Sequence, residues 1–155
     1  MWPWVSTLNY NYKGMAKLYL ALGSNIGARQ ANIMSALSFL NGYLGRYEAL
    51  SDIVTTEAHG FDGPEFLNCV ARYSTRKSPE TILSICKEIE QRMGRREQVM
   101  YAPDGTRIFH NRIIDIDILK YGKVEMHTPE LTIPHPQIET RPFVRPLLEQ
   151  VMKND

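Results

Sequence analysis

The chain has 155 residues, of which 43% are hydrophobic and 23% are charged, and this ordinary composition argues against intrinsic disorder. The length fits one domain with a core large enough to fold without disulfide bonds. The 18 Lys and Arg residues balance 17 Asp and Glu residues, which argues against a nucleic-acid or membrane-surface binder because such proteins carry a basic excess.

The first part of the chain has no regular hydrophobic pattern. Residues 1–14 end at a glycine, just before the first strong pattern begins at Met15. We therefore expect a flexible N-terminal extension over residues 1–14 and a single domain over residues 15–155. The alternative is that Trp2 and Trp4 pack onto the domain as an anchor.

Hydrophobic periodicity and glycines mark the next elements. Residues 17–22 are rich in strand-forming residues, and Gly23 predicts the turn that ends this strand. Apolar residues then recur at helical spacing over residues 28–40, and Gly42 marks the predicted end of the helix. Residues 47–56 form the second predicted strand.

A third strand, a second helix and a loop follow. The strand is predicted over residues 66–75. Ser78 and Pro79 provide a capping residue and a proline in the first helical turn, and Gly94 suits the position after the helix. Residues 94–111 show neither period, so we expect a long loop there, and such loops are usually functional or disordered.

The last part of the chain completes a recognisable order of elements. Residues 112–120 form a strand of strong pattern, residues 124–126 and 131–133 are candidates for short edge strands, and residues 143–152 form a last helix. The order β-α-β-β-α-β predicts a ferredoxin-like α+β fold. In this fold, helices pack on an antiparallel sheet, here followed by a C-terminal extension.

Two acidic residues on one predicted strand give the sharpest local signal. In residues 112–118 (RIIDIDI), alternation places Asp115 and Asp117 on one face and the isoleucines on the other. Two aspartates about 7 Å apart on one face repel each other unless a positive charge lies between them. Mg²⁺ suits this arrangement, because it binds one or two carboxylates together with substrate phosphates. The alternative is a solvated polar face.

Arginines surround this acidic strand in the sequence. Such residues near a two-carboxylate metal site suit a triphosphate, although each alone is also explained as an exposed charge. They are Arg92, Arg95, Arg96, Arg107, Arg112, Arg141 and Arg145. Residues 23–27 (GSNIG) resemble a phosphate loop but lack its full pattern, and a strand-to-helix turn explains them as well.

A histidine and two aromatic residues are further candidates. His135 lies between two prolines, a rigid frame that suits either a group pointing at a ligand or an ordinary sheet edge. Phe66 and Phe143 belong to the core in the simpler interpretation. Because Asn68 and Arg141 flank them, they are equally suited to clamp a flat heterocycle.

The two cysteines bear on the cellular compartment. Cys69 and Cys86 are too few and too far apart for a disulfide framework or a zinc site. We expect free, buried thiols in a reducing compartment. The N-terminal residues lack a signal-peptide pattern, so the sequence predicts a cytoplasmic location.

Taken together, five segments resemble the 6-hydroxymethyl-7,8-dihydropterin pyrophosphokinase family of folate biosynthesis. They occur in the family's order over residues 17–148. They are residues 19–25 (YLALGSN), 65–68 (EFLN), 89–95 (IEQRMGR), 112–118 (RIIDIDI) and 131–135 (LTIPH), the last continuing through Arg141, Pro142 and Phe143. The resemblance implies a ferredoxin-like fold and transfer of a diphosphoryl group from ATP to the hydroxymethyl oxygen of the dihydropterin, with release of AMP.

The resemblance also implies roles for individual residues. Phe66 and Phe143 would stack on the pterin, and Asn68 would bond its amide edge. The full pterin-binding set is Thr56, His59, Phe66, Asn68, Phe109 and Phe143. The ATP-binding set is Glu90, Arg112, Ile118, His135 and Arg141. The catalytic set is Arg95, Arg112, Asp115 and Asp117, and the two aspartates would hold two Mg²⁺ ions.

Two alternatives from other classes remain open. A ferredoxin-like binding module for RNA or a small ligand would need exposed sheet aromatics and a basic face. A pterin-binding relative without turnover would be favoured by loss of Asp115 or Asp117, and both are present. The expected partners are ATP and the dihydropterin, with no nucleic acid and no membrane. A monomer is expected, with a weak dimer as the alternative.

Overall fold

The computed structural model describes residues 14–57, 64–94, 100–101, 103–104, 107–108 and 113–153. The predicted extension at 1–14 therefore lies, except for Gly14, outside the described residues. The elements are, in order, β1 (Ala16–Ser24), α1 (Arg29–Leu44), β2 (Ala49–Leu50), β3 (Val54–Thr56), β4 (Phe66–Thr75), α2 (Pro79–Arg92), β5 (Met100–Tyr101), β6 (Arg107–Ile108), β7 (Asp115–Tyr121), β8 (Met126–His127), β9 (Thr132–Ile133), α3 (Gln137–Thr140) and α4 (Val144–Val151).

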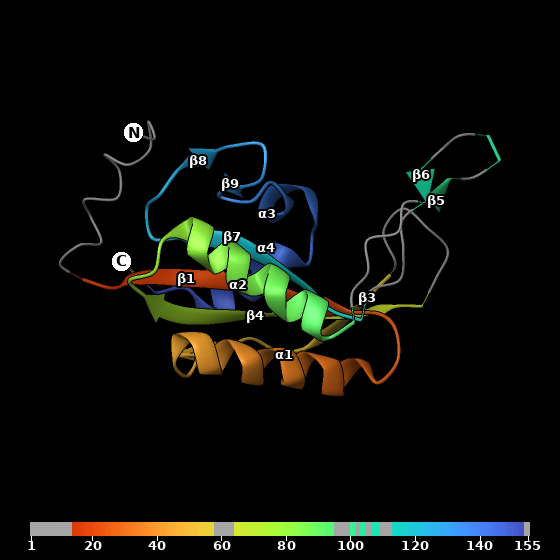
Figure 1. The fold of residues 1–155 in the computed structure, drawn as a ribbon, viewed down its shortest axis with the longest axis horizontal. Helices are drawn as coiled ribbons and strands as arrows, with labels where there is room; N and C mark the ends of the chain where they lie inside the picture. Colours follow the sequence, from red (N-terminus) through yellow and green to blue (C-terminus); the bar gives the residue numbers. More distant parts are fainter. Residues whose placement is uncertain are drawn as a thin grey trace.

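One antiparallel sheet organises the molecule (Figure 1). Its strands lie in the order β2-β4-β1-β7, and β3 also pairs with β4. With β2 and β3 counted as one interrupted strand, this is the βαββαβ arrangement of a ferredoxin-like sheet. The predicted fold class is confirmed.

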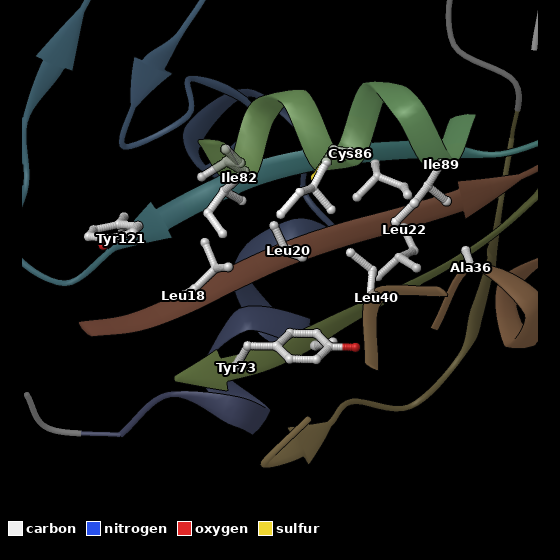
Figure 2. Close-up of a cluster of buried hydrophobic side chains, with 14 of the residues drawn as sticks. Leu18, Leu20, Leu22, Ala36, Leu40, Tyr73, Ile82, Cys86, Ile89 and Tyr121 are labelled. Atoms are coloured by element: carbon white, nitrogen blue, oxygen red, sulfur yellow. The ribbon is translucent and has the colours of Figure 1, made fainter. Parts of the chain in front are cut away.

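Helices α1 and α2 cover one face of this sheet. Leu18, Leu20 and Leu22 of β1 alternate toward this face and are almost fully buried. Figure 2 shows them directed at the core together with Ile82 and Ile89 of α2. The main hydrophobic core therefore lies between the sheet and these two helices.

The opposite face of the sheet is covered only in part, by α3 and α4. Tyr19 and Val70 form a second buried cluster with residues of α4 such as Leu147. The end of the chain is tied to the sheet here, because the Tyr19 hydroxyl accepts a hydrogen bond from the Lys153 N–H (3.1 Å). The polar residues singled out from the sequence on these strands lie on the same face, beyond this second cluster. They are Asn68, Asp115 and Asp117.

Two glycines do not have the positions that the sequence predicts. Gly23 does not end β1, since it pairs with residues of both β4 and β7 and the strand continues to Ser24. Gly42 does not end α1, which runs through it to Leu44 and stops before Gly45, whose φ is 79°. Of Gly23, Gly42 and Gly45, only Gly45 has the left-handed conformation that favours glycine. Gly94 has φ 95° and follows α2 as predicted.

The strand predicted over residues 47–56 is two short strands with an interruption. Leu50 pairs with Ala71 and Val54 pairs with Asn68, so the strand carries one more residue than its partner between these pairs. The Ser51 hydroxyl bridges the interruption by accepting a hydrogen bond from the Val70 N–H (2.8 Å). The Ser51 side chain thus serves as the acceptor that a backbone carbonyl provides in a regular strand pair. Hydrophobic periodicity does not reveal such a replacement.

Three further predictions in the second half need correction. β7 begins at Asp115 rather than at residue 112. The loop predicted over residues 94–111 contains β5 and β6, which pair with each other. The candidate edge strands β8 and β9 also pair with each other instead of extending the main sheet. Within the part of the chain that the structure describes, none of the helices has the length and apolar character needed to span a bilayer.

Candidate active site

A cavity of about 480 Å³ opens on the sheet face that carries α3 and α4. Residues of β1, β3, β4 and β7 form its floor and one side, and α3 and α4 contribute the other side. Seven residues singled out from the sequence line it: Thr56, Phe66, Asn68, Asp115, Asp117, Arg141 and Phe143. The structure thus brings together candidate site residues that are up to 87 positions apart in the chain (143 − 56).

The cross-strand register explains the shape of this cavity. Gly23 of β1 lies between Asn68 of β4 and Asp115 of β7. In the next row of the same face, Ala21 lies between a valine of β4 and Asp117. Because the middle strand carries only a hydrogen atom and a methyl group, the sheet is hollowed between its amide-bearing and carboxylate-bearing neighbours.

Gly23 is required by a close approach and not by its backbone angles. A Cβ atom built there would lie 3.0 Å from Asn68 Oδ1 and 3.5 Å from Phe66 Cδ1. The first distance is shorter than an ordinary carbon–oxygen contact. The glycine therefore lets Asn68 and Phe66 lie close against the centre of the sheet.

The amide end of the cavity is fixed by a short hydrogen bond. The Asn68 Nδ2 donates to the Thr56 hydroxyl at 2.6 Å, which joins β4 to β3. Phe66, at the start of β4, and Phe143, just before α4, are both half-buried and line the cavity. A flat ligand with a polar edge fits this combination of an oriented amide and two aromatic rings.

The carboxylate end lies on β7, which is an edge strand of the sheet. Asp115 and Asp117 are half-buried, and the Gln137 Nε2 donates to Asp117 Oδ2 at 3.2 Å. Among the described residues, no three His, Cys, Asp or Glu side chains group so as to hold a metal ion. Two carboxylates facing a cavity instead match the way Mg²⁺ binds, with phosphates and water supplying its other ligands.

Groups from outside the sheet satisfy part of the free edge of β7. The Ile116 N–H donates to Glu90 Oε2 (2.8 Å), and the Leu119 carbonyl accepts from the His135 N–H (2.9 Å). Alternation places Leu119 on the opposite face from Ile118, and the pairing of β7 with β1 shifts its register at this point. The edge of the strand thus holds His135 beside β7, close enough to Asp115 to feel its charge.

The protonation state of His135 follows from its contacts. Its Nδ1 accepts a hydrogen bond from the Gln137 N–H (3.1 Å), which leaves the ring proton on Nε2. Burial lowers the pKa of His135 below its ordinary value, the nearby Arg141 guanidinium lowers it further, and Asp115 opposes them in part. His135 is therefore a neutral hydrogen-bond donor near pH 7.

Comparison of the sequence with known proteins identifies a family and several relatives. The model of the 7,8-dihydro-6-hydroxymethylpterin-pyrophosphokinase family matches residues 19–153. The chain belongs to this family. Three proteins named 2-amino-4-hydroxy-6-hydroxymethyldihydropteridine pyrophosphokinase are similar to it. That of Porphyromonas gingivalis is 41% identical, over 88% of this chain and 91% of the relative. That of Aquifex aeolicus is 39% identical (87% and 80%), and that of Bacillus subtilis is 33% identical (84% and 75%).

The resemblance stated from the sequence is confirmed, but three of the described residues carried over from the pyrophosphokinase family do not line the cavity: His135, Ile118 and Glu90. The Ile118 side chain is 2% exposed and belongs to the core on the helix face, so only its backbone is available to a nucleotide. Glu90 is buried, and its carboxylate supports the edge of β7. Alternation explains Ile118, because it shares a face with Ile116 rather than with the aspartates.

Other predicted residues of the family lie outside the described part of the chain, so their predicted roles stay predictions. These are His59, Arg95, Phe109 and Arg112. Among the arginines expected near the phosphates, Arg141 lines the cavity. By contrast, Arg92 pairs with Glu88 (3.0 Å) and Arg145 pairs with Glu139, both at the surface.

The segment that resembled a phosphate loop contacts the chain that leads into β4. Asn25 is buried, and its Nδ2 donates to the Pro64 carbonyl (3.2 Å). Arg29 Nη1 donates to the Glu65 carbonyl at 2.7 Å. The segment between β1 and α1 is thus a strand-to-helix turn, and its Asn25 and Arg29 of α1 hold the chain just before Phe66.

Proposed function

We propose that the chain transfers the diphosphoryl group of ATP to the hydroxymethyl oxygen of 6-hydroxymethyl-7,8-dihydropterin, giving AMP and the dihydropterin diphosphate. The observation that carries this proposal is the row Asn68–Gly23–Asp115 across three adjacent strands. It sets a recognition amide and a carboxylate about two strand spacings, roughly 10 Å, apart on one cavity floor. A bicyclic ring can therefore bond Asn68 while its side arm points toward the aspartates.

The pterin would occupy the end of the cavity formed by β3 and β4. Phe66 and Phe143 offer ring faces for stacking, and Asn68 offers an amide that Thr56 already holds in place. A polar edge matched by a buried amide rejects analogues that lack it, because the amide would be left without its partner. This end of the cavity supports selection of a pterin over an apolar ring of similar size.

Mg²⁺ fits the other end, where we propose that Asp115 and Asp117 hold two ions. The aspartates face the cavity from one strand and leave room for phosphate oxygens, as this cation requires. When bound, Mg²⁺ would neutralise phosphate charge and orient the transferred group. Arg141 adds positive charge from the cavity wall, and His135 offers an Nε2–H donor beside the same strand. These residues bind and orient, which is most of what phosphoryl transfer needs from a protein.

The RNA-binding alternative is not favoured by the sheet. An RNA-recognition domain presents aromatic residues on an open sheet face. Here the corresponding face carries Asp115 and Asp117 and is covered in part by α4. The second alternative, a pterin-binding relative without turnover, differs from the proposal only in whether AMP is formed.

The deciding experiment is an assay of AMP release from ATP, Mg²⁺ and the hydroxymethyl dihydropterin. We expect turnover by the wild type, and a loss of at least about 100-fold in Asp117→Asn, since even partners of metal ligands contribute 10- to 100-fold. Asp52→Asn is the matched control, because this exposed carboxylate on the β2–β3 connection bonds Gln150. Absence of AMP with the wild type would refute the proposed reaction. Normal turnover of Asp117→Asn would refute the metal site.

We also propose that the enzyme acts in the cytoplasm as a monomer. Cys69 and Cys86 are buried free thiols, which suits a reducing compartment. Size-exclusion chromatography with light scattering tests the monomer, and a dimer mass at micromolar concentration would contradict it.

A further inference from the structure

Gln137 occupies a central position that the sequence did not single out. It is the first residue of α3, it is only 7% exposed, and it lines the cavity. It follows Pro136 directly and lies two residues after His135. A long polar side chain is rarely buried to this degree unless it is hydrogen-bonded.

Three hydrogen bonds connect this residue to three proposed site residues. Its Nε2 donates to Asp117 Oδ2 (3.2 Å), and its backbone N–H donates to His135 Nδ1 (3.1 Å). Its backbone carbonyl accepts from the Arg141 N–H (2.9 Å). Only the first of these bonds depends on the side chain, so substitution can remove it and leave the other two in place.

The bond to Asp117 has a defined chemical consequence. An amide N–H occupies one lone pair of Oδ2 and restrains rotation of the carboxylate, so the remaining lone pairs point in a set direction. The donor is neutral, so it does not compete with a cation for the negative charge as a lysine or arginine would. Partners of this kind orient metal-binding carboxylates in many proteins.

We infer that Gln137 is a positioning residue that holds the Asp117 carboxylate in the orientation for binding Mg²⁺ with the nucleotide. This inference rests on the proposed function, because it takes Asp117 as a metal ligand. Its backbone bonds place the same residue between His135 and Arg141. One residue therefore joins the carboxylate to the two residues expected to contact the phosphates.

The test measures metal binding directly. Mn²⁺ serves as the spectroscopic substitute for Mg²⁺, and its binding is followed by electron paramagnetic resonance in the presence of a non-hydrolysable ATP analogue. In Gln137→Met, which keeps the length of the side chain, the Mn²⁺ dissociation constant should rise 10- to 100-fold, the usual range for such partners. The affinity for the analogue without metal should stay within about twofold, because the backbone bonds to His135 and Arg141 remain.

Two further variants separate positioning from a general structural effect. Gln150 of α4 donates to Asp52 Oδ2 at 3.3 Å, the same type of pair away from the cavity, so Gln150→Met should leave Mn²⁺ binding unchanged. In an Asp117→Asn background, adding Gln137→Met should produce no further loss, because the two residues act through one bond. Circular dichroism and thermal melting test whether each variant is folded. If Gln137→Met does not fold, Gln137→Leu is used in its place.

Each outcome decides the inference. Unchanged Mn²⁺ affinity in a folded Gln137 variant would overturn it, and so would an equal loss of metal-free nucleotide affinity. Additive losses in the double variant would also overturn it. If the wild type bound no Mn²⁺ with the analogue, the metal site and this inference would fail together. If it bound Mn²⁺ in a Gln137-dependent way but released no AMP, the proposed reaction would fail and the inference would stand.

Discussion

Replacing Gly23 with alanine is the sharpest test of how the sheet creates the cavity. Its φ lies outside the left-handed region, so the backbone accepts alanine without strain. The added Cβ, however, would lie 3.0 Å from Asn68 Oδ1. Asn68 cannot yield freely, since its amide is buried and bonded to Thr56 at 2.6 Å. The substitution should therefore displace the amide by a few tenths of an ångström.

The expected size of the effect follows from these contacts. Overpacking costs about 1–3 kcal/mol, and loss of glycine's freedom in the unfolded chain returns about 0.4–1 kcal/mol. The free energy of unfolding should therefore fall by about 0–2.6 kcal/mol. A misplaced amide that no longer bonds the pterin costs about 1–3 kcal/mol, which corresponds to roughly 5- to 140-fold in pterin affinity.

Steady-state kinetics and thermal melting check both numbers. In Gly23→Ala the KM for the dihydropterin should rise by the stated factor while the KM for ATP changes little. Gly42→Ala is the matched control, because Gly42 lies in α1 with no atom within 4 Å of the added Cβ. That variant should gain about 0.5–1 kcal/mol of stability and keep wild-type kinetics. An unchanged KM for the pterin in Gly23→Ala, or an equal rise for ATP, would refute the reasoning.

Three other predictions concern single side chains. Phe143→Ala should weaken pterin binding at least about tenfold, because a stacked ring is lost, and should change ATP binding little; titration calorimetry measures both, and equal losses would contradict the clamp. In an NMR titration, the pKa of His135 should lie below 6.5 and rise in Arg141→Gln. Since the unfolded chain then binds more protons below pH about 6.5, His135 should cost stability as the pH falls through that value; a pKa of 6.5 or higher would contradict its burial. Burial raises the pKa of the Cys69 thiol to about 12 and raises that of Cys86 as well, so neither should react with an aromatic disulfide reagent at pH 8 until the protein unfolds, and rapid reaction of the folded protein would oppose this.

The order of elements could be predicted because each long element carries a local pattern. β1, β4 and β7 are rich in strand-forming residues, and both long helices repeat apolar residues at helical spacing. The interruption between β2 and β3 could not be predicted, since it depends on the Ser51 hydroxyl meeting the Val70 N–H from another strand. The same limit applies to the end of α1, where Gly42 and Gly45 look equivalent until the backbone angle of Gly45 is known.

The candidate site, too, was predicted only where its residues follow from a local pattern. Asp115 and Asp117 were predicted because neighbours on one strand face follow from spacing alone. The importance of Gly23 was not predicted, because it depends on the residues that the two neighbouring strands place beside it. Gln137 was missed for a related reason: nothing in the sequence relates it to an aspartate 20 positions earlier. The one local feature that could have pointed to Gln137 is its position directly after Pro136, the second of the two prolines that flank His135.

The position of the site on an edge strand follows from the same contacts. An edge leaves N–H and C=O groups unpaired, which exposes a strand to unwanted pairing. Here the Glu90 carboxylate accepts a hydrogen bond from the Ile116 N–H, and the His135 N–H donates one to the Leu119 carbonyl. These two groups therefore also protect the edge of β7 from unwanted pairing. Had β7 been central, a neighbouring strand would occupy this space, and neither His135 nor Gln137 could approach the carboxylates from the side. An edge position therefore lets the strand that carries the two carboxylates bond Glu90 of α2, His135 and Gln137, the first residue of α3.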